Sequence, residues 1–427
     1  METAVSRSPP KAQHEHSNFL KTAVRHVKTV HLRTRKSRMP REKKHHKQDA
    51  KLSEQYPKFA PVTPRHRKTH MCSFLHNIHN TSKEADIATA FAAVSDVDFQ
   101  KYQSVWSFMP PATSKEMKAA RRDQIKQFVE STLSKGPKGL VAEFKKVPKH
   151  DDLAAMTEFV AQNAWKKNRY KDVGCLDANR VIVAVGKYTY IHANYVATPS
   201  NPRKFICTQG PLPHTCPEFW CMVVQEEAKA IVMLCNLIEQ NTSKCADYYP
   251  RSSKKPMTFE GDVAVYCKTN EMFKFPFETP AEIEITTLDV TVPGMPPHSC
   301  VHYHWVDWPD RAVPLADIAP LYFLCQFARM REPVIMHCSA GTGRTGVMVL
   351  LQNAMEILAR GGMLKSMSVY LDELRAQRSN SVQNEQQYLF VHQVLMNFLQ
   401  KTGWLPQSLD PAIEAFRKSY HKYTKGF

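Results

Sequence analysis

One segment, residues 333–358 (PVIMHCSAGTGRTGVMVLLQNAMEIL), constrains the fold of this chain more than any other. The residues PVIM predict a short buried strand, and an apolar helix follows directly after Arg344. Between them lies a loop, Cys338 to Arg344, that contains two glycines. A buried strand, a tight loop and a helix N-terminus together form a cradle for an anion, because the loop amides and the helix dipole face one point. We therefore expect an α/β fold with an anion site at this turn.

The loop carries residues that suit phosphate transfer. A thiol at a helix N-terminus has a depressed pKa, so we expect Cys338 to be a thiolate nucleophile at neutral pH. The Arg344 guanidinium would fork onto two phosphate oxygens, and the Thr345 hydroxyl would donate to the thiolate as it leaves. The residues expected to cradle the phosphate are Ser339, Ala340, Gly341, Thr342 and Gly343. The sequence contains no GxxxxGK[ST] pattern, so a nucleotide-binding loop is not implied.

The segment resembles the HCSAGxGRTG signature of the tyrosine-specific, cysteine-dependent protein phosphatases. Five more segments resemble that family's other segments in the family's order, and they are KNRYKDV, FICTQGPLPHTCPEFWCMV, IEQNTSKCADYYP, HYHWVDWPDRAVP and SVQNEQQYLF. Together the matches cover nearly all of residues 116–403. The resemblance implies a highly twisted mixed β-sheet flanked by helices. It also implies hydrolysis of phosphotyrosine in proteins through a cysteinyl-phosphate, with no metal and no cofactor.

The resemblance assigns the acid and the water-handling residues. Asp310, in a mobile loop, would protonate the leaving tyrosyl oxygen and then act as base on the attacking water. Gln383 would position that water, with Gln387 as its supporting partner. Glutamine suits this role because it donates and accepts hydrogen bonds without changing charge.

The resemblance also assigns the substrate-binding residues. Tyr170 would stack on the substrate ring and set the pocket depth, so that phosphotyrosine but not phosphoserine reaches Cys338. Asp172 would take backbone amides of the substrate peptide. Lys244 would contact the closed acid loop, and Glu239 lies in the same segment. For Lys244 and Glu239 an ordinary surface charge is nearly as good an explanation.

The chain departs from the family pattern at several positions. Ala312 stands where glycine is usual after the acid loop's aspartate, and Arg311 beside it adds positive charge near the pocket mouth. His192 replaces an asparagine, Tyr249 a tryptophan, and Asn384 a threonine. None of these changes removes a catalytic group, but they leave the rate open. The alternative is therefore a catalytically weak or silent phosphotyrosine-binding module on the same fold.

The charge of the chain lies at its N-terminus. The net charge is +18, and residues 1–70 alone hold 18 Lys and Arg against 5 Asp and Glu. Such composition favours a disordered basic tail, although NFLKTAVRHVKTV has the spacing of a basic amphipathic helix. The tail would contact an acidic membrane surface, nucleic acid or an acidic protein. Residues 71–115 form a linker of unclear structure, residues 116–403 the catalytic domain, and residues 404–427 a short C-terminal tail.

The remaining features bear on compartment and local structure. The 11 cysteines are scattered, without a CxxC pair, and no secretory or membrane-spanning run is visible. We therefore expect an intracellular, cytoplasmic protein, with a nuclear location open because of the basic tail. The oligomeric state is left open. Periodicity predicts strands at 180–185, 188–196, 205–210, 229–237, 262–267, 281–290 and 299–305, and helices at 121–133, 140–144, 217–228, 316–330, 344–360, 365–378 and 384–402.

Overall fold

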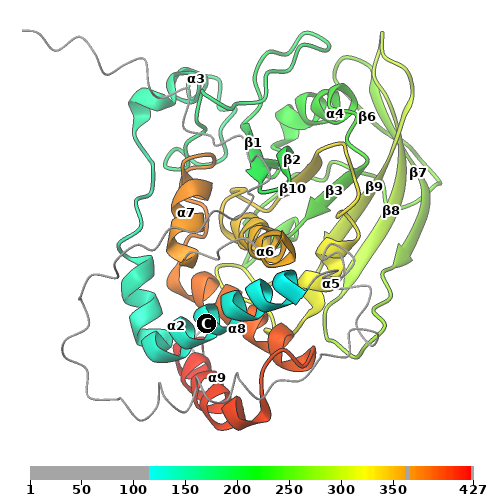
Figure 1. Cartoon of the computed structure of the whole chain (residues 1–427). Helices are drawn as coiled ribbons and strands as arrows, with labels where there is room; N and C mark the ends of the chain where they lie inside the picture. Colours follow the sequence, from blue (N-terminus) through cyan, green and yellow to red (C-terminus); the bar gives the residue numbers. More distant parts are fainter. Residues whose placement is uncertain (1–114, 361–365, 425–427) are drawn as a thin grey trace, which may run out of the picture. The chain divides into compact units, whose positions relative to one another are not determined.

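A computed structural model describes residues 115–360 and 366–424, all of which belong to one compact unit (Figure 1). The predicted basic tail, the predicted linker up to residue 114 and the amphipathic spacing within the tail lie outside these ranges. The helices are α2 Lys115–Phe144, α3 Thr157–Gln162, α4 Cys216–Gln225, α5 Ala319–Cys325, α6 Gly343–Arg360, α7 Met367–Arg375, α8 Glu385–Lys401 and α9 Asp410–Thr424. Short 3₁₀ helices occupy Leu153–Ala155, Pro213–Thr215 and Gln407–Leu409.

Eight strands form one mixed sheet in the order β1-β2-β10-β3-β9-β8-β7-β6. The strands are β1 Ala193–Thr198, β2 Asn201–Thr208, β3 Ala230–Met233, β6 Met257–Phe259, β7 Val263–Met272, β8 Ile283–Thr291, β9 His298–Trp305 and β10 Val334–His337. Strands β2, β10, β3 and β9 pair in parallel, and the outer pairs are antiparallel. A separate hairpin joins β4 Ile238–Glu239 to β5 Thr242–Ser243. The predicted mixed α/β fold is confirmed.

Burial along the strands follows from this order. Every residue of β3 and of β10 is buried, as expected for parallel strands that are covered on both faces. Burial largely alternates along β8 and β9, which pair with each other antiparallel where the sheet leaves its parallel centre. Helix α6 packs on β1 and β10, and α2, α5, α7 and α8 pack around α6, whereas α4 contacts β7 (Figure 1). Because β10 lies in the parallel centre of the sheet, the phosphate loop that follows β10 begins in the core.

The two predicted helices at 121–133 and 140–144 are parts of one long element. Helix α2 spans both, with a kink at Gly136, whose φ is +57°, followed by Pro137. The SKGPKG break was thus correctly predicted as an interruption, because glycine accepts this backbone and proline removes an amide. The faces of α2 on both sides of the kink are buried through Ile125, Val129 and Leu140.

The predicted strand at 180–185 is wrong. Arg180 makes one isolated bridge to Asn194, and no strand forms between residues 115 and 192. The side-chain amide of Gln225 occupies the place of a neighbouring strand, since its Oε1 accepts from the Ala184 amide at 2.6 Å and its Nε2 donates to the Ile182 carbonyl at 2.9 Å. Of the segment predicted as a strand at 188–196, only the residues from Ala193 onward form part of a strand, β1.

The segment after residue 403 is not a simple extension. Helix α9 packs against α2 and α8, and it buries Ile413, Phe416 and Tyr420. The position of the domain boundary stays a proposal, but residues 410–424 are part of the packed helices.

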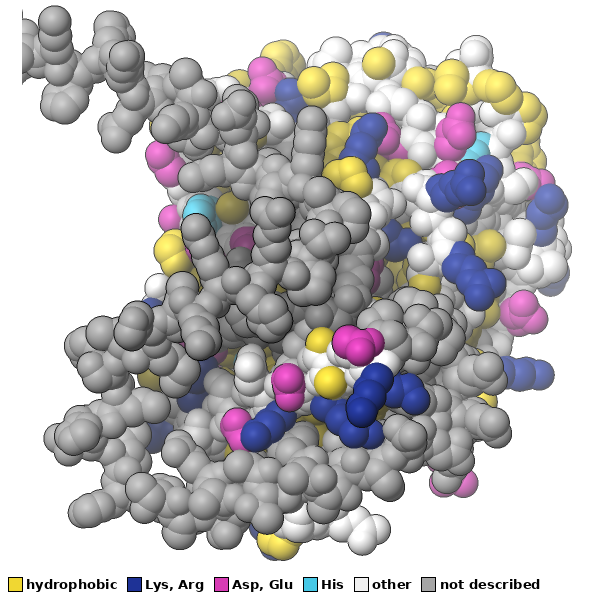
Figure 2. Space-filling view, viewed as in Figure 1, with side chains coloured by type: hydrophobic (Ala, Val, Ile, Leu, Met, Phe, Trp, Pro, Cys, Tyr) yellow, Lys and Arg dark blue, Asp and Glu magenta, His cyan; other side chains and the backbone are white. Residues whose placement is uncertain are grey.

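Two surface findings concern the described residues. On the face seen in Figure 2, basic and acidic side chains are interspersed and do not form one field of a single sign. Within the ranges 115–360 and 366–424, no helix is both long enough and apolar enough to cross a membrane.

Candidate active site

The phosphate loop begins where β10 ends. Strand β10 runs to His337, Cys338 is the next residue, and α6 starts at Gly343. The φ of Gly341 is +68°, and a Cβ at this position would lie 1.9 Å from the Thr208 carbonyl oxygen. Only glycine fits here. In this conformation the Gly341 amide donates a hydrogen bond to Cys338 Sγ at 3.2 Å.

A buried arginine, Arg378, holds the outer side of the loop. Its guanidinium donates to the carbonyl oxygens of Ala340 and Gly341, each at 3.1 Å. In a trans peptide the carbonyl and the following amide point in opposite directions, so the amides of Gly341 and Thr342 face into the loop. Arg378 could not be singled out from sequence, because nothing in the polar stretch RAQRSN distinguishes it from a surface arginine.

His192 connects Arg378 to the segment KNRYKDV. Its Nδ1 accepts from the Arg378 guanidinium at 3.0 Å, and its Nε2 donates to the Val173 carbonyl oxygen at 2.8 Å. Burial and the charge of Arg378 lower the pKa of His192 to about 3, so the ring is neutral at physiological pH. The histidine that replaces the usual asparagine thus supplies an acceptor on one side and a donor on the other.

The Cys338 thiol lies in surroundings that favour its ionised form. Burial raises the pKa of Cys338, but the charge of Arg344, the neighbouring Thr345 and the hydrogen bond from the Gly341 amide outweigh burial, and the net shift is downward. A lowered pKa makes the thiolate available as a nucleophile at neutral pH. The predicted acidity of this thiol therefore has a physical basis in the loop.

Arg344 is held by a carboxylate that the sequence left ambiguous. Its guanidinium forms a two-pronged ion pair with Glu239, at 2.6 Å to Oε1 and 2.5 Å to Oε2. Glu239 is buried and also accepts from the Asn236 amide. Burial lowers the pKa of Arg344, because it disfavours the charged guanidinium. The negative charges of Glu239 and Cys338 outweigh burial, and the pKa of Arg344 lies above its ordinary value. Glu239 is thus no ordinary surface charge, and it fixes the orientation of the guanidinium.

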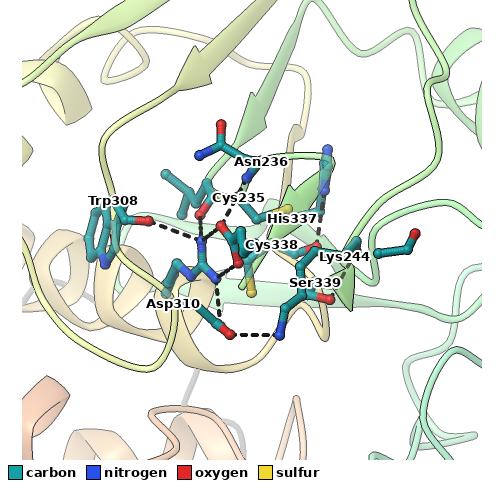
Figure 3. Close-up of polar contacts among 12 residues, drawn as sticks. Cys235, Asn236, Lys244, Trp308, Asp310, His337, Cys338 and Ser339 are labelled. Carbon is teal, nitrogen blue, oxygen red and sulfur yellow. Dashed lines mark hydrogen bonds and ion pairs between the residues drawn. The ribbon is translucent and has the colours of Figure 1, made fainter. Parts of the chain in front are cut away.

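Asp310 lies inside the pocket, on the loop that follows β9. Its Oδ2 pairs with Lys244 Nζ at 2.6 Å and its Oδ1 with the Arg344 guanidinium at 2.8 Å (Figure 3). Burial raises the pKa of Asp310, but the two cations lower this pKa by more than burial raises it. The pKa of Asp310 therefore lies below its ordinary value. Lys244, whose role was open from sequence, is buried against this carboxylate.

Gln383 lies over the N-terminus of α6. A Cβ on Gly343 would come within 2.5 Å of Gln383 Oε1 and 3.0 Å of Gln387 Nε2. The Gln383 amide donates to Gln387 Oε1 at 2.8 Å. The preceding Val382 has a φ of +55°, an uncommon value for a β-branched residue, and its amide donates to the Thr342 carbonyl at 3.0 Å. A strained, anchored turn thus places Gln383 against the phosphate loop.

Tyr170 lines the pocket next to the phosphate loop. Its hydroxyl hydrogen-bonds to Ser339 Oγ at 2.7 Å, and Ser339 Oγ donates to the Lys244 carbonyl at 2.9 Å. Gln209 holds the segment around Tyr170, because it accepts from the Arg169 amide and donates to the Lys167 carbonyl, both at 2.8 Å. Gln209 was not singled out from sequence, although it lies within a segment that resembles the family.

A pocket of about 130 Å³ collects most of the predicted site. Ten of the fourteen predicted residues line it, together with Val173 and Arg311, and the ten are Tyr170, Asp172, Lys244, Asp310, Cys338, Ser339, Ala340, Arg344, Gln383 and Gln387. The other four, Gly341, Thr342, Gly343 and Thr345, belong to the same loop and helix start but do not line the cavity. The described residues contain no cluster of His, Cys, Asp and Glu that would hold a metal ion.

A strand–loop–helix turn on a mixed α/β sheet thus brings together a thiol of lowered pKa, an arginine fork and a carboxylate paired with that arginine, which is the arrangement expected of a cysteine-dependent phosphatase. The family model for protein-tyrosine phosphatase matches residues 164–397. The chain belongs to the protein-tyrosine phosphatase family.

Several known proteins share this region. The Lar-like tyrosine-protein phosphatase of Caenorhabditis elegans is 36% identical over 242 residues, which are 54% of this chain and 10% of that protein. Human tyrosine-protein phosphatase non-receptor type 12 is 29% identical over 252 residues, which are 55% of this chain and 30% of that protein. The solved catalytic domain of human protein tyrosine phosphatase non-receptor type 18 is 31% identical, with a TM-score of 0.49, 56% of this chain covered and 88% of that domain. The chain thus spans at most about a third of the length of these curated relatives.

Proposed function

We propose that this chain is a protein-tyrosine phosphatase that hydrolyses phosphotyrosine in proteins through a cysteinyl-phosphate on Cys338. The observation that carries the proposal is the meeting of three groups in one pocket. They are a thiol with a lowered pKa, the Arg344 guanidinium fixed by Glu239, and the Asp310 carboxyl 2.8 Å from that guanidinium. These are the nucleophile, the charge clamp and the acid that phosphate monoester cleavage needs.

In the first step the Cys338 thiolate attacks phosphorus in line with the leaving tyrosyl oxygen. Arg344 and the inward-facing amides stabilise the charge on the equatorial oxygens. Asp310 donates its proton to the tyrosyl oxygen, and tyrosine leaves as a neutral phenol.

Asp310 must first acquire that proton. Burial raises the pKa of Asp310, but Lys244 and Arg344 outweigh burial and hold this pKa below its ordinary value. A bound phosphate dianion takes over the Arg344 fork and adds negative charge beside the carboxyl, and both effects raise the pKa of Asp310. The substrate therefore brings the acid into its active protonation state.

In the second step water attacks the phosphocysteine. Gln383, which lies over the loop beside Gly343, would orient this water, and the Asp310 carboxylate would accept its proton. Phosphate leaves with the Cys338 thiolate restored, and the Thr345 hydroxyl would stabilise the departing sulfur. We propose no metal and no cofactor in either step, because Arg344 and the loop amides supply the positive charge.

The pocket wall supports selectivity for phosphotyrosine. Tyr170 lines the pocket and is tied to Ser339 of the phosphate loop at 2.7 Å, so its ring stands at the side of the entrance. We propose that an aromatic ring stacks on Tyr170 and spans the depth to Cys338, and that the shorter phosphoserine side chain does not. Asp172, exposed at the pocket rim, would accept hydrogen bonds from substrate amides.

The test is hydrolysis of a phosphotyrosine peptide and of its phosphoserine counterpart with a metal chelator present. We expect turnover of the phosphotyrosine peptide alone, its loss in Cys338→Ser, and a large loss in Asp310→Asn. Cys325→Ser and Asp307→Asn are matched controls, since Cys325 lies on α5 and the Asp307 carboxylate instead accepts from the Glu282 amide at 3.0 Å. Binding of the peptide without release of phosphate would instead identify a phosphotyrosine-binding module.

The basic tail adds a second, separate proposal. Residues 1–70, with their excess of Lys and Arg, would bring the enzyme to an acidic membrane surface, nucleic acid or an acidic protein, and a nuclear location follows if the partner is nuclear. Salt-sensitive retention on acidic vesicles or on nucleic acid by the full chain, absent after removal of residues 1–70, would support it. Equal retention of both forms would contradict it.

A further inference from the structure

The departures from the family pattern at Arg311 and Asn384 meet at one contact. The Asn384 side-chain Nδ2 donates to the Arg311 carbonyl oxygen at 2.9 Å. The Oδ1 of the same side chain accepts from the Gln387 amide at 2.9 Å and caps α8. One amide thus bonds the turn that carries Gln383 and the loop that carries Asp310.

The acceptor of this contact is a residue in a demanding conformation. Arg311 has a φ of +55°, in the left-handed region that non-glycine residues occupy at a cost. Such a conformation persists only where the surroundings hold it. The Asn384 hydrogen bond is part of those surroundings.

The acid loop is fixed at both ends of its chain segment. Asn236 Nδ2 donates to the Val306 carbonyl at 2.9 Å before the loop, and Asn397 of α8 donates to the Ala316 carbonyl after it. Between these anchors, the hydrogen bonds of residues 308–314 to the rest of the described chain come from three side chains. They are Arg344, Lys244 and Asn384.

Substrate affects these three contacts differently. A bound phosphate competes for the Arg344 guanidinium, and protonation of Asp310 removes the ion pairs to Arg344 and Lys244. The Asn384 contact involves neither Asp310 nor the phosphate cradle. The Arg344 hydrogen bond to the Trp308 carbonyl at 3.2 Å uses the guanidinium that phosphate engages. The Asn384 contact is therefore the polar contact of the acid loop that depends neither on Asp310 nor on the Arg344 guanidinium.

We propose that Asn384 is a positioning residue that holds the acid loop over the pocket once phosphate has engaged Arg344. The proposal rests on the proposed phosphatase function. Asn384 would act through the placement of Asp310 and would touch neither substrate nor the reacting atoms. Its loss would reduce the fraction of time that Asp310 spends within reach of the leaving oxygen.

Two substitutions separate the loop contact from the helix cap. Asn384→Ser keeps a good cap for α8, but its hydroxyl is too short to reach the Arg311 carbonyl as well. Asn384→Ala removes both contacts. We expect kcat for a phosphotyrosine peptide to fall about three- to tenfold in both variants, the range that one hydrogen bond supports. The melting temperature should fall in Asn384→Ala and stay near the wild-type value in Asn384→Ser.

The choice of substrate tests whether Asn384 acts through the acid. An aryl phosphate with a weakly basic leaving group needs little protonation, so its kcat should change less than that of the phosphotyrosine peptide. In an Asp310→Asn background, Asn384→Ser should cause no further loss, because the acid to be positioned is absent.

A measurement without turnover keeps this proposal separate from the proposed function. Tungstate, an unreactive phosphate-like anion, should bind Asn384→Ser about three- to tenfold more weakly than the wild-type chain in calorimetry, if loop closure supports anion binding. Suppose that the wild-type chain binds tungstate more tightly than Asn384→Ser does but hydrolyses no phosphotyrosine peptide. This result would overturn the proposed phosphatase function and would still support the role of Asn384 in holding the acid loop. Wild-type turnover and tungstate affinity in Asn384→Ser would show that the side chain only caps α8, and would overturn the proposal.

Discussion

Arg378→Lys tests how the phosphate loop obtains its geometry. The guanidinium is fully buried and makes four hydrogen bonds, two to loop carbonyls, one to Asn194 Oδ1 at 2.9 Å and one to His192 Nδ1 at 3.0 Å. A lysine keeps the charge, but its single ammonium lacks the planar fork that reaches these acceptors together.

The magnitude follows from the acceptors that lose their donor. If lysine satisfies two of the four, two buried acceptors remain unpaired, at about 1–3 kcal/mol each. We therefore expect the free energy of unfolding to fall by about 2–6 kcal/mol, measured by urea titration with linear extrapolation. With the carbonyls of Ala340 and Gly341 released, the inward-facing amides lose their orientation. The pKa of Cys338 should then rise, measured from the pH dependence of alkylation by iodoacetamide.

Arg375→Lys is the matched control. Arg375 is also buried, and its guanidinium donates to the carbonyls of Ser381 and Val382 and of Val147, but not to the phosphate loop. It should lower stability by a similar amount and leave the pKa of Cys338 nearly unchanged. If both variants move the pKa of Cys338 equally, or neither does, the reasoning about Arg378 and the loop amides is refuted.

Four further predictions concern the same pocket. Glu239→Gln removes the carboxylate partner of Arg344, and loss of one partner from a buried ion pair costs about 3–5 kcal/mol. The free energy of unfolding measured in urea should fall by that amount, and an unchanged free energy of unfolding would contradict the pairing. Gly341→Ala places a Cβ 1.9 Å from a carbonyl oxygen, so we expect a sharp loss of folded protein in expression and circular dichroism. Because the folded pKa of Cys338 is lowered, its thiolate adds stability that is full above the unfolded pKa and is lost as pH falls through the folded pKa. The stability difference between wild type and Cys338→Ser should therefore shrink towards acid pH, and a difference independent of pH would argue against the shift. Asp310 must be protonated to act as the general acid, and its pKa is lowered in the free chain. The value of kcat/KM should therefore fall as pH rises above the acid range, and Asp310→Asn should abolish this fall.

Much of the site could be predicted from local patterns. Cys338, Arg344 and the loop between them lie within a few residues of each other, so their chemistry depends on one strand–loop–helix turn that the sequence marks clearly. Asp310 and Gln383 come from distant segments, and only the family resemblance placed them together. The structure brings both to the pocket, and their catalytic roles stay predictions.

What the sequence did not reveal depends on tertiary contacts. Arg378 and Glu239 are charged residues in polar stretches, and such residues are mostly exposed. Their burial follows only from the partners that the fold supplies, the loop carbonyls for Arg378 and the guanidinium of Arg344 for Glu239. The strand predicted at 180–185 failed for a related reason, since the Gln225 side chain took the bonds that a neighbouring strand would have made.

The packing of α2 on α9 has a consequence for how the chain is synthesised. Helix α2 ends at Phe144, whereas α9 begins at Asp410, and α2 also needs α8 to cover Phe128 and Phe144, whose rings contact His392 and Tyr388. At ribosomal speeds of roughly 5–20 residues per second, the apolar face of α2 waits about 10 to 50 seconds for its partners to emerge. During that interval the apolar face of α2 is exposed on the nascent chain, so we expect chaperones to bind α2.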